Sequence, residues 1–189
     1  MPMPVKISET EIPAVKVVET GIFHDARGFF SESHSIPMWE NAGFTEVFVQ
    51  DNLSKSAKGV LRGMHYQLNP SGMGKLVRCV SGAVFDVAVD LREGSPSFGK
   101  WVGRELTGEN HLSLWVPVGF AHGFVSLADD SLVHYKCTGV HTPDCERALR
   151  YNCPEVGIAW PLEPTVISEK DAAAPGLGEA EYNFSYSAD

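Results

Sequence analysis

The chain has 189 residues, of which 43% are hydrophobic and 21% charged; these values favour a single globular domain spanning residues 1–189 and exclude a disordered, collagen-like or coiled-coil chain. The 24 acidic and 15 basic residues give a formal net charge of −9, which disfavours nucleic acid as a partner because phosphate backbones need a basic face. No apolar run approaches the roughly 20 residues of a membrane helix and no signal-peptide core is present, so we expect a cytoplasmic protein without membrane contact.

The N-terminal part of the sequence predicts two strands and one helix. Val15–Glu19 and Phe29–His34 are short apolar runs of the kind that form strands. Ser35 is a candidate N-cap, and the segment Pro37–Ala42 that follows it predicts a short helix that ends at Gly43.

The clearest predicted strand is Val84–Arg92, in which apolar and polar or small residues alternate with a period of two. Turn residues and short apolar runs predict five more strands: Leu76–Val80, Lys100–Leu106, His111–Val116, Gly123–Leu127 and Leu132–Cys137. Near the end of the chain, Ser168–Asp171 resembles a capping box and predicts a short helix, Ala172–Ala174. About ten short strands in one domain indicate a mainly β fold, either a sandwich or a jelly-roll barrel.

Three clusters of unusual residues stand out along the chain. The first is Gly59–Gln67, in which Arg62, His65 and Gln67 lie beside glycines that allow a ligand to approach the backbone. Arg62 suits a phosphate or carboxylate, and His65 can accept a proton near neutral pH. Taken alone, a histidine in a strand is more often structural than catalytic.

The second cluster is Trp115–Phe124, where a Pro-x-Gly turn precedes His122 in an apolar setting. Its simplest interpretation is a buried histidine bonded to a backbone carbonyl. In the third cluster, alternation places Tyr135 with Val133 and Cys137 on the inner face of a strand. This tyrosine is either a core residue or an acid that faces a cavity.

Together these clusters resemble the dTDP-4-dehydrorhamnose 3,5-epimerase family of the cupin superfamily. Three motifs are long enough that their joint occurrence by chance is negligible: Arg-Gly-x-His-Tyr-Gln, Asp-Val-Ala-Val-Asp-Leu-Arg and Gly-Phe-Ala-His-Gly-Phe. The segments that carry the resemblance run in order along nearly the whole chain: Asp25–Glu32, Phe48–Asn52, Gly59–Gln67, Gly74–Arg78, Val84–Arg92 with Ser95-Pro96, Trp115–Phe124, Tyr135-Lys136, Ile158–Pro161 and Ser168–Asp171.

The resemblance implies a jelly-roll (cupin) barrel, a homodimer in which an N-terminal strand reaches the neighbouring subunit, and a dTDP-linked sugar as substrate. The implied reaction is epimerisation of dTDP-4-keto-6-deoxy-D-glucose at C3 and C5 to dTDP-4-keto-L-rhamnose, usually for the rhamnose of a cell-surface polysaccharide. Such a reaction needs a base, a group that stabilises an enolate, and an acid on the opposite face of the sugar.

The same resemblance assigns roles to individual residues. His65 matches the family's base, Asp171 its partner, Tyr135 the acid, and Lys75 the group beside the sugar's carbonyl oxygen. Asp171 also fits the capping box, and the two roles are compatible. The substrate-binding positions that the resemblance implies are Arg27, Glu32, Gln50, Asp51, Asn52, Arg62, His122, His141, Glu146 and Lys170.

Some of these positions have alternative interpretations or depart from the family pattern. Taken alone, Arg27 and Glu32 can be interpreted as an exposed ion pair that contributes less than about 1 kcal/mol to stability. Val140-His141 stands where relatives often have consecutive tyrosines, one of which stacks on thymine, and Tyr151-Asn152 replaces a usual Trp-Asp pair. These departures concern the base-binding part of the expected site and leave the positions of the base, the acid and the lysine unchanged.

Three other functions compete with this hypothesis. A single-centre epimerase would use the same base and acid on either C3 or C5. A non-catalytic sugar-binding cupin would have lost the base or the acid, whereas His65 and Tyr135 are both present. A metal-dependent cupin oxygenase would need the His-x-His motif of metal cupins, but Gln67 stands where the second histidine would be.

We expect the protein to need neither a metal nor another cofactor. One histidine from each cupin motif supplies too few ligands for a tight transition-metal site. Cys79, Cys137, Cys145 and Cys153 form no Cys-x-x-Cys pair, so we expect free thiols. Dialysis against a strong chelator should leave the epimerisation rate unchanged; restoration of a chelator-inactivated enzyme by a divalent cation would contradict this prediction.

Overall fold

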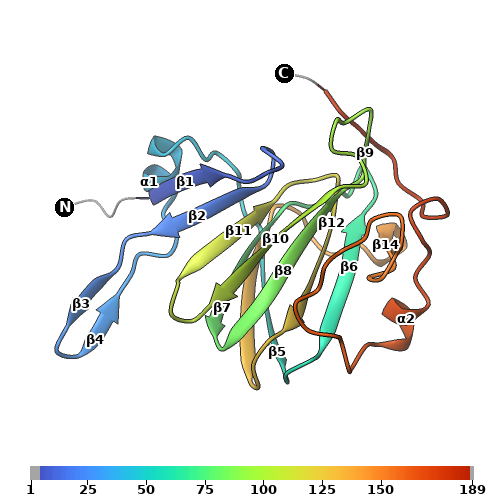
Figure 1. Cartoon of the computed structure of the whole chain (residues 1–189). Helices are drawn as coiled ribbons and strands as arrows, with labels where there is room; N and C mark the ends of the chain where they lie inside the picture. The colour runs from blue at the N-terminus through green and yellow to red at the C-terminus, as the bar shows by residue number, and fades with distance from the viewer. Residues whose placement is uncertain (1–4, 188–189) are drawn as a thin grey trace.

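The computed structural model describes residues 5–187, which fold mainly into two antiparallel sheets stacked against each other (Figure 1). The six-stranded sheet has the order β1 (Val5–Glu9), β2 (Lys16–Thr20), β11 (Leu112–Val116), β7 (Lys75–Ser81), β13 (Ser131–Cys137) and β5 (Gln50–Ser56). The five-stranded sheet has the order β10 (Trp101–Thr107), β8 (Ala83–Asp90), β12 (Phe120–Ser126), β6 (Leu61–Gln67) and β14 (Glu146–Ala148).

The remaining elements are short. A separate hairpin is formed by β3 (Phe23–Asp25) and β4 (Gly28–Phe30), and β9 (Arg92–Glu93) pairs in parallel with β15 (Phe184–Ser185). The helical elements are α1 (Ile36–Asn41), η1 (Pro143–Cys145) and α2 (Glu169–Ala172). Within the described part of the chain, none of these helices is long and apolar enough to cross a membrane.

A hydrophobic core fills the space between the two sheets. Val77 and Leu114 from one sheet and Phe120 and Phe124 from the other belong to the same buried cluster. The opposite face of the five-stranded sheet is also covered, because residues from the C-terminal segment pack on it. Leu149 and Phe184 belong to this second cluster, together with β8 side chains.

Strand β8 is therefore buried on both faces. The alternation in Val84–Arg92 correctly predicts a strand, but its polar positions Asp86 and Asp90 are 0% exposed. A period of two cannot distinguish a solvated polar face from a polar face that the opposite sheet covers. The burial of these two carboxylates depends on contacts made only in the folded chain.

Several predicted boundaries need correction. The expected strand Phe29–His34 ends at Phe30, and the expected strand Gly123–Leu127 begins earlier, at Phe120. The predicted N-terminal helix forms as α1, but the Ser35 side chain makes no capping hydrogen bond. The predicted C-terminal helix is shifted, since α2 covers Glu169–Ala172 instead of 172–174.

Candidate active site

A cleft with two lobes opens between the sheets. The lobe that contains Arg62, called the Arg62 lobe, has a volume of about 540 Å³; the lobe that contains His141, called the His141 lobe, has about 410 Å³. His65, Lys75 and Tyr135 line both lobes and therefore mark their junction. His65 extends from the five-stranded sheet, whereas Lys75 and Tyr135 extend from the six-stranded sheet.

His65 pairs with an acid that is 106 positions away in sequence. Its Nε2 lies 2.7 Å from Asp171 Oδ1, and the Gly63 backbone N–H donates to Asp171 Oδ2 at 3.3 Å. Glycine is needed at position 63, where φ is +128° and an added Cβ would lie 2.4 Å from Gly123 Cα on β12. This close approach of β6 and β12 fixes the strand that carries His65.

The predicted capping box at Ser168 is only half formed, which resolves the two interpretations of Asp171. Ser168 Oγ accepts a hydrogen bond from the Asp171 backbone N–H at 3.1 Å, while the Asp171 carboxylate turns toward His65. Burial raises the pKa of this carboxyl group, but the contacts with His65, Gly63 and Ser168 outweigh it and the pKa lies below the usual value. Asp171 is therefore ionised at neutral pH and holds the His65 ring in place.

The opposite wall of the junction carries Lys75 and Tyr135. Burial lowers the pKa of the Lys75 amine, an effect that the nearby Cys137, Asp86 and Glu146 partly oppose. Burial also raises the pKa of the Tyr135 phenol, so the hydroxyl keeps its proton at neutral pH. The Lys75 amine and a phenol that can donate a proton thus face a histidine across one cleft.

His122 lies on β12 directly opposite His65 in the register of β6 and β12. Its Nε2 is 2.8 Å from Asp86 Oδ1, so the interpretation of a histidine satisfied by a backbone carbonyl is wrong. Asp86 was not among the predicted site residues. The signal for it was an acid in the middle of the predicted strand Val84–Arg92, and only the folded structure brings it against His122.

The His141 lobe is lined by many polar side chains, which come from several strands and from the loop that carries His141. Gln50 and Asn52 on β5 line it together with His141 and Glu146. Glu146 binds Lys170 Nζ at 2.5 Å and lies 3.6 Å from His141 Nε2. Burial raises the Glu146 pKa, but Lys170, His65 and His141 outweigh this effect, and the pKa lies below the usual value.

Arg62 lies at the exposed edge of its lobe, and its guanidinium is oriented by β5. Its Nε donates to Ser56 Oγ at 3.0 Å and its Nη2 donates to the Lys55 carbonyl at 3.1 Å. Lys170 lines the same lobe. Two cationic side chains that are at least partly exposed therefore stand at the edge of the cleft.

Three of the expected substrate-binding residues lie outside the two lobes. Asp51 projects to the outer face of β5 and pairs with Lys136 at 2.9 Å, because its neighbours Gln50 and Asn52 take the inner face. Arg27 lies on the β3–β4 hairpin and pairs with Asp25 instead of Glu32. Neither Arg27 nor Glu32 lines either lobe.

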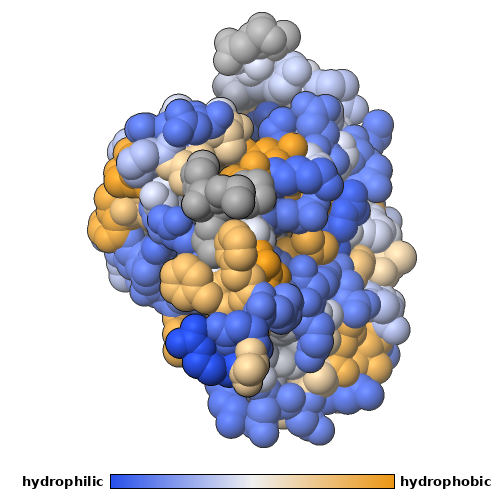
Figure 2. All heavy atoms as spheres, turned by 90° about the vertical axis from the view of Figure 1, so that its left-hand side faces the viewer, coloured by the Kyte–Doolittle hydropathy of each residue, from blue (hydrophilic) through white to orange (hydrophobic). Residues whose placement is uncertain are grey.

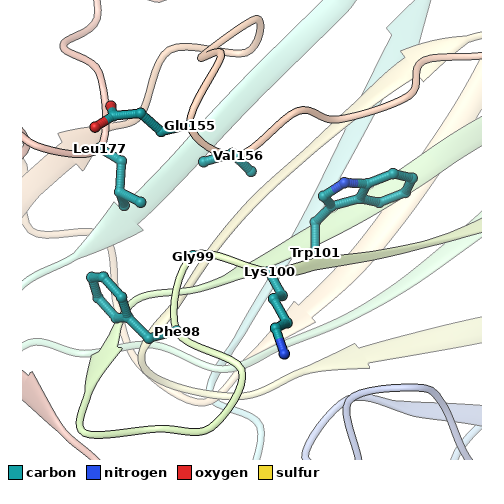
Figure 3. Close-up of a pocket in the computed structure, with 7 residues that line it drawn as sticks. All are labelled: Phe98, Gly99, Lys100, Trp101, Glu155, Val156 and Leu177. Carbon is teal, nitrogen blue, oxygen red and sulfur yellow. The ribbon is translucent and has the colours of Figure 1, made fainter.

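A further hollow, shown in Figure 3, lies on the outside of the molecule between β10 and the C-terminal segment. Phe98, Trp101, Val156 and Leu177 form much of its wall, with Lys100 and Glu155 beside them. No histidine or tyrosine is among its lining residues, so it lacks the histidine and tyrosine that face each other in the two-lobed cleft. Within residues 5–187 there is also no group of three or more His, Cys, Asp or Glu residues that could hold a metal ion.

Comparison with known proteins identifies the family. The profile described as dTDP-4-dehydrorhamnose 3,5-epimerase matches residues 9–179. The dTDP-4-dehydrorhamnose 3,5-epimerase of Shigella flexneri is 49% identical over 177 residues, which cover 93% of this chain and 98% of that protein. This chain belongs to the dTDP-4-dehydrorhamnose 3,5-epimerase family.

Solved structures of family members agree with this assignment. The dTDP-6-deoxy-D-glucose-3,5-epimerase of Legionella pneumophila, in complex with dTDP-4-keto-L-rhamnose, is 48% identical with a TM-score of 0.88 and matches 93% of this chain and 94% of that one. A 3′-monoepimerase from Streptomyces bikiniensis, in complex with dTDP-quinovose, is 35% identical with a TM-score of 0.84 and matches 90% and 87%. The predicted cupin-type β fold and the predicted epimerase activity are confirmed by this family membership.

Proposed function

We propose that the chain epimerises dTDP-4-keto-6-deoxy-D-glucose at C3 and C5, with His65 as the base and Tyr135 as the acid. The observation that carries this proposal is that His65 and Tyr135 belong to different sheets and line the same cavity. A sugar ring held between the two walls exposes one face to each residue. Inversion of a carbon requires this arrangement, because the proton must leave one face and return to the other.

The first step removes a proton from a carbon next to the C4 carbonyl. The C–H bond breaks, a new N–H bond forms on His65, and the electron pair moves onto the carbonyl oxygen as an enolate. Asp171 engages Nε2 at 2.7 Å, which leaves the second ring nitrogen to accept the proton. The ionised Asp171 stabilises the imidazolium that forms, as a buried carboxylate does in other His–Asp pairs.

Lys75 stabilises the enolate oxygen. Its amine is a hydrogen-bond donor at the junction of the two lobes, and a donor placed for a developing oxyanion contributes about 2.7–4 kcal/mol to transition-state stabilisation. His122, fixed by Asp86, lies beside His65 and lines the same wall of the Arg62 lobe. Tyr135 then returns a proton: its O–H bond breaks and a C–H bond forms on the opposite face. Solvent reprotonates the tyrosinate and deprotonates His65 before the second carbon reacts.

The nucleotide extends from this junction. Arg62 and Lys170 are the cations available for the diphosphate, and arginine in particular binds phosphate through paired hydrogen bonds. Gln50, Asn52 and His141 offer amide groups and a flat ring for the base in the His141 lobe. Diphosphate binding would draw Lys170 away from Glu146, which then keeps His141 Nε2 as a neighbour at 3.6 Å.

The β3–β4 hairpin supports a homodimer. It projects from the two-sheet body at the side of β1 and β2 (Figure 1), and Arg27 at its turn is 90% exposed. Phe29 and Phe30 in the same hairpin are 54% and 68% exposed, and Figure 2 presents apolar side chains scattered over this side of the molecule. Exposed aromatic side chains of this kind are typical of interfaces. A second copy would bury them and receive Arg27 and Glu32 at its own cleft.

Mixing two variants, each impaired in a different function, tests this exchange of hairpins. Arg27→Ala should weaken substrate binding, and His65→Asn should remove the base. If the hairpin crosses, a mixed dimer contains one site with both His65 and Arg27. Random pairing in a symmetric dimer then restores about a quarter of the wild-type sites. The measurement is the epimerisation rate of the co-refolded mixture at low substrate concentration.

One outcome of this experiment would contradict the exchange of hairpins between subunits. If Arg27 serves its own chain or no site, the mixed protein has only the summed activity of the two variants. Light scattering on the wild-type protein supplies the second measurement, since a monomer would exclude the exchange without affecting the assignment of His65 and Tyr135.

The proposed reaction is tested with dTDP-4-keto-6-deoxy-D-glucose and a reductase that consumes the L-rhamnose form. In deuterated water, a 3,5-epimerase places deuterium at both C3 and C5 of the product, whereas a single-centre epimerase inverts and labels one of them. The 49% identity to a 3,5-epimerase against 35% to a monoepimerase favours two labelled carbons. Binding without turnover would support the sugar-binding cupin instead.

A further inference from the structure

Gln67 is a buried polar residue that the reaction proposed above does not use. It is the last residue of β6, two positions after His65, and is 6% exposed. Its Nε2 donates to the carbonyl oxygens of Ser71 at 2.7 Å and Val140 at 3.2 Å, and its Oε1 accepts from the Thr142 backbone N–H at 2.7 Å. One side-chain amide thus joins two loops that are about 70 residues apart in sequence.

The loop 139–142 depends on such side-chain contacts. Thr138 bonds to the Gly74 carbonyl and Cys145 bonds to the Thr142 carbonyl, but residues 139–141 make no backbone–backbone hydrogen bond within the described chain. The His141 backbone N–H is bonded at 3.0 Å to Gln50 Oε1. Because this loop lacks backbone hydrogen bonds of its own, its order depends on these side-chain hydrogen bonds.

The position of this loop determines the shape of the His141 lobe. His141 lines the lobe, and its Nε2 lies 3.6 Å from Glu146 Oε2 on the adjacent β14. Met73, in the other loop that Gln67 holds, lines the same lobe. The two loops that supply His141 and Met73 to the wall of the lobe are therefore both bonded to the Gln67 amide. His65, Lys75 and Tyr135, in contrast, lie on strands.

We propose that Gln67 is a positioning residue for the nucleoside: its amide orders the loop 139–142 and so keeps His141 at the wall of its lobe before substrate arrives. Both amide hydrogens and the carbonyl oxygen already have backbone partners, so the amide has no free donor for a ligand. Gln67 therefore acts through His141 and Met73. This inference rests on the proposed placement of the nucleoside in the His141 lobe.

The principal test is the Gln67→Leu variant, which keeps the volume and removes all three hydrogen bonds. The affinity for dTDP, measured by calorimetry, should fall by about tenfold, because binding must now order at least one more backbone residue. The KM should rise by a similar factor, and kcat should stay within about threefold because the strands that carry the base and acid are unchanged. Gln67→Glu provides an isosteric second variant, which keeps the acceptor for Thr142 but loses both donors.

Asn183 offers a control for the other loop that Gln67 holds, the one that carries Met73. Its side-chain amide clamps the Asn69 backbone of that loop, with Oδ1 accepting at 2.9 Å and Nδ2 donating at 3.0 Å, and it does not touch the loop 139–142. Asn183→Ala should therefore lower the affinity for dTDP much less than Gln67→Leu does. If both variants weaken binding equally, the effect comes from the loop that carries Met73 or from general loosening, and the role of Gln67 in positioning His141 is excluded.

Hydrogen exchange of the unliganded protein separates this inference from the proposed function. Gln67→Leu should accelerate exchange at the His141 amide, although its own acceptor, Gln50, is untouched. An unchanged His141 amide means that Gln67 does not order the loop, and the inference is then wrong whatever the enzyme binds. Faster exchange with unchanged dTDP affinity places the nucleoside elsewhere and overturns the nucleoside role alone. Failure of the wild-type protein to turn over substrate would instead contradict the proposed function.

Discussion

We expect His65→Asn to reduce the epimerisation rate by about 10²–10⁴-fold, the contribution of a general base. Asparagine occupies similar space and can still bond to Asp171, so the fold is preserved while the proton acceptor is lost. The affinity for dTDP should remain close to that of the wild type, because the base acts on the sugar and not on the diphosphate. Calorimetry with dTDP and a coupled reductase assay measure the two quantities.

His134→Asn is the matched control for this variant. His134 lies on the outer face of β13, 3.6 Å from Asp51, and therefore forms a second His–carboxylate pair outside the cleft. Its replacement should leave the rate within about twofold, as for most surface substitutions. A folded His65→Asn protein that retains more than a few per cent of the wild-type rate would remove His65 from the role of base.

Tyr135→Phe separates proton removal from proton return. The change deletes one hydroxyl group, so packing is kept and His65 still removes the proton. In deuterated water the substrate should exchange its hydrogens next to the carbonyl, while net inversion falls by about 10²–10⁴-fold for want of the acid. His65 can return a proton only to the face from which it took one. The expected result in the NMR spectrum is exchange with retention of configuration.

Tyr182→Phe provides the comparison, since this tyrosine packs against Phe98 on the outside of the molecule. It should invert both centres at the wild-type rate. If Tyr135→Phe also inverts both centres at that rate, Tyr135 is a packing residue and the acid is another group. If exchange stops together with inversion, the phenol takes part in proton removal and the two steps are not independent.

Local patterns in the sequence predict much of the fold. The period-two alternation of Val84–Arg92 predicts β8, and the turn residues predict the strands on either side of it. The boundaries fail where tertiary pairing decides them. Strand β5 was not predicted, because its residues Gln50–Ser56 are mostly polar and only pairing with β13 makes them a strand.

The candidate site was likewise predicted in part from local sequence patterns, and in part depends on tertiary contacts. Motifs single out His65, His122 and Tyr135 as unusual residues, because histidine and tyrosine are uncommon within apolar strands. The resemblance to the epimerase family adds roles for these residues and for Lys75 and Asp171. Spacing alone could not assign Asp171, because Ser168–Asp171 satisfies a capping box whether or not the carboxylate reaches His65.

The sequence by itself determined the mainly β class, the family and the types of group that the chemistry needs, since these depend on local alternation and on contiguous motifs. The tertiary structure decided which groups meet. Strand stacking sets His65 and Tyr135 on opposite walls, and the C-terminal segment brings Asp171 back across 106 positions to His65. The tertiary structure also places the Asp51 side chain outside the cleft and bonds the loop 139–142 to Gln67. These contacts join residues far apart in the chain, so no local pattern specifies them; they arise when the two sheets close over their shared apolar core.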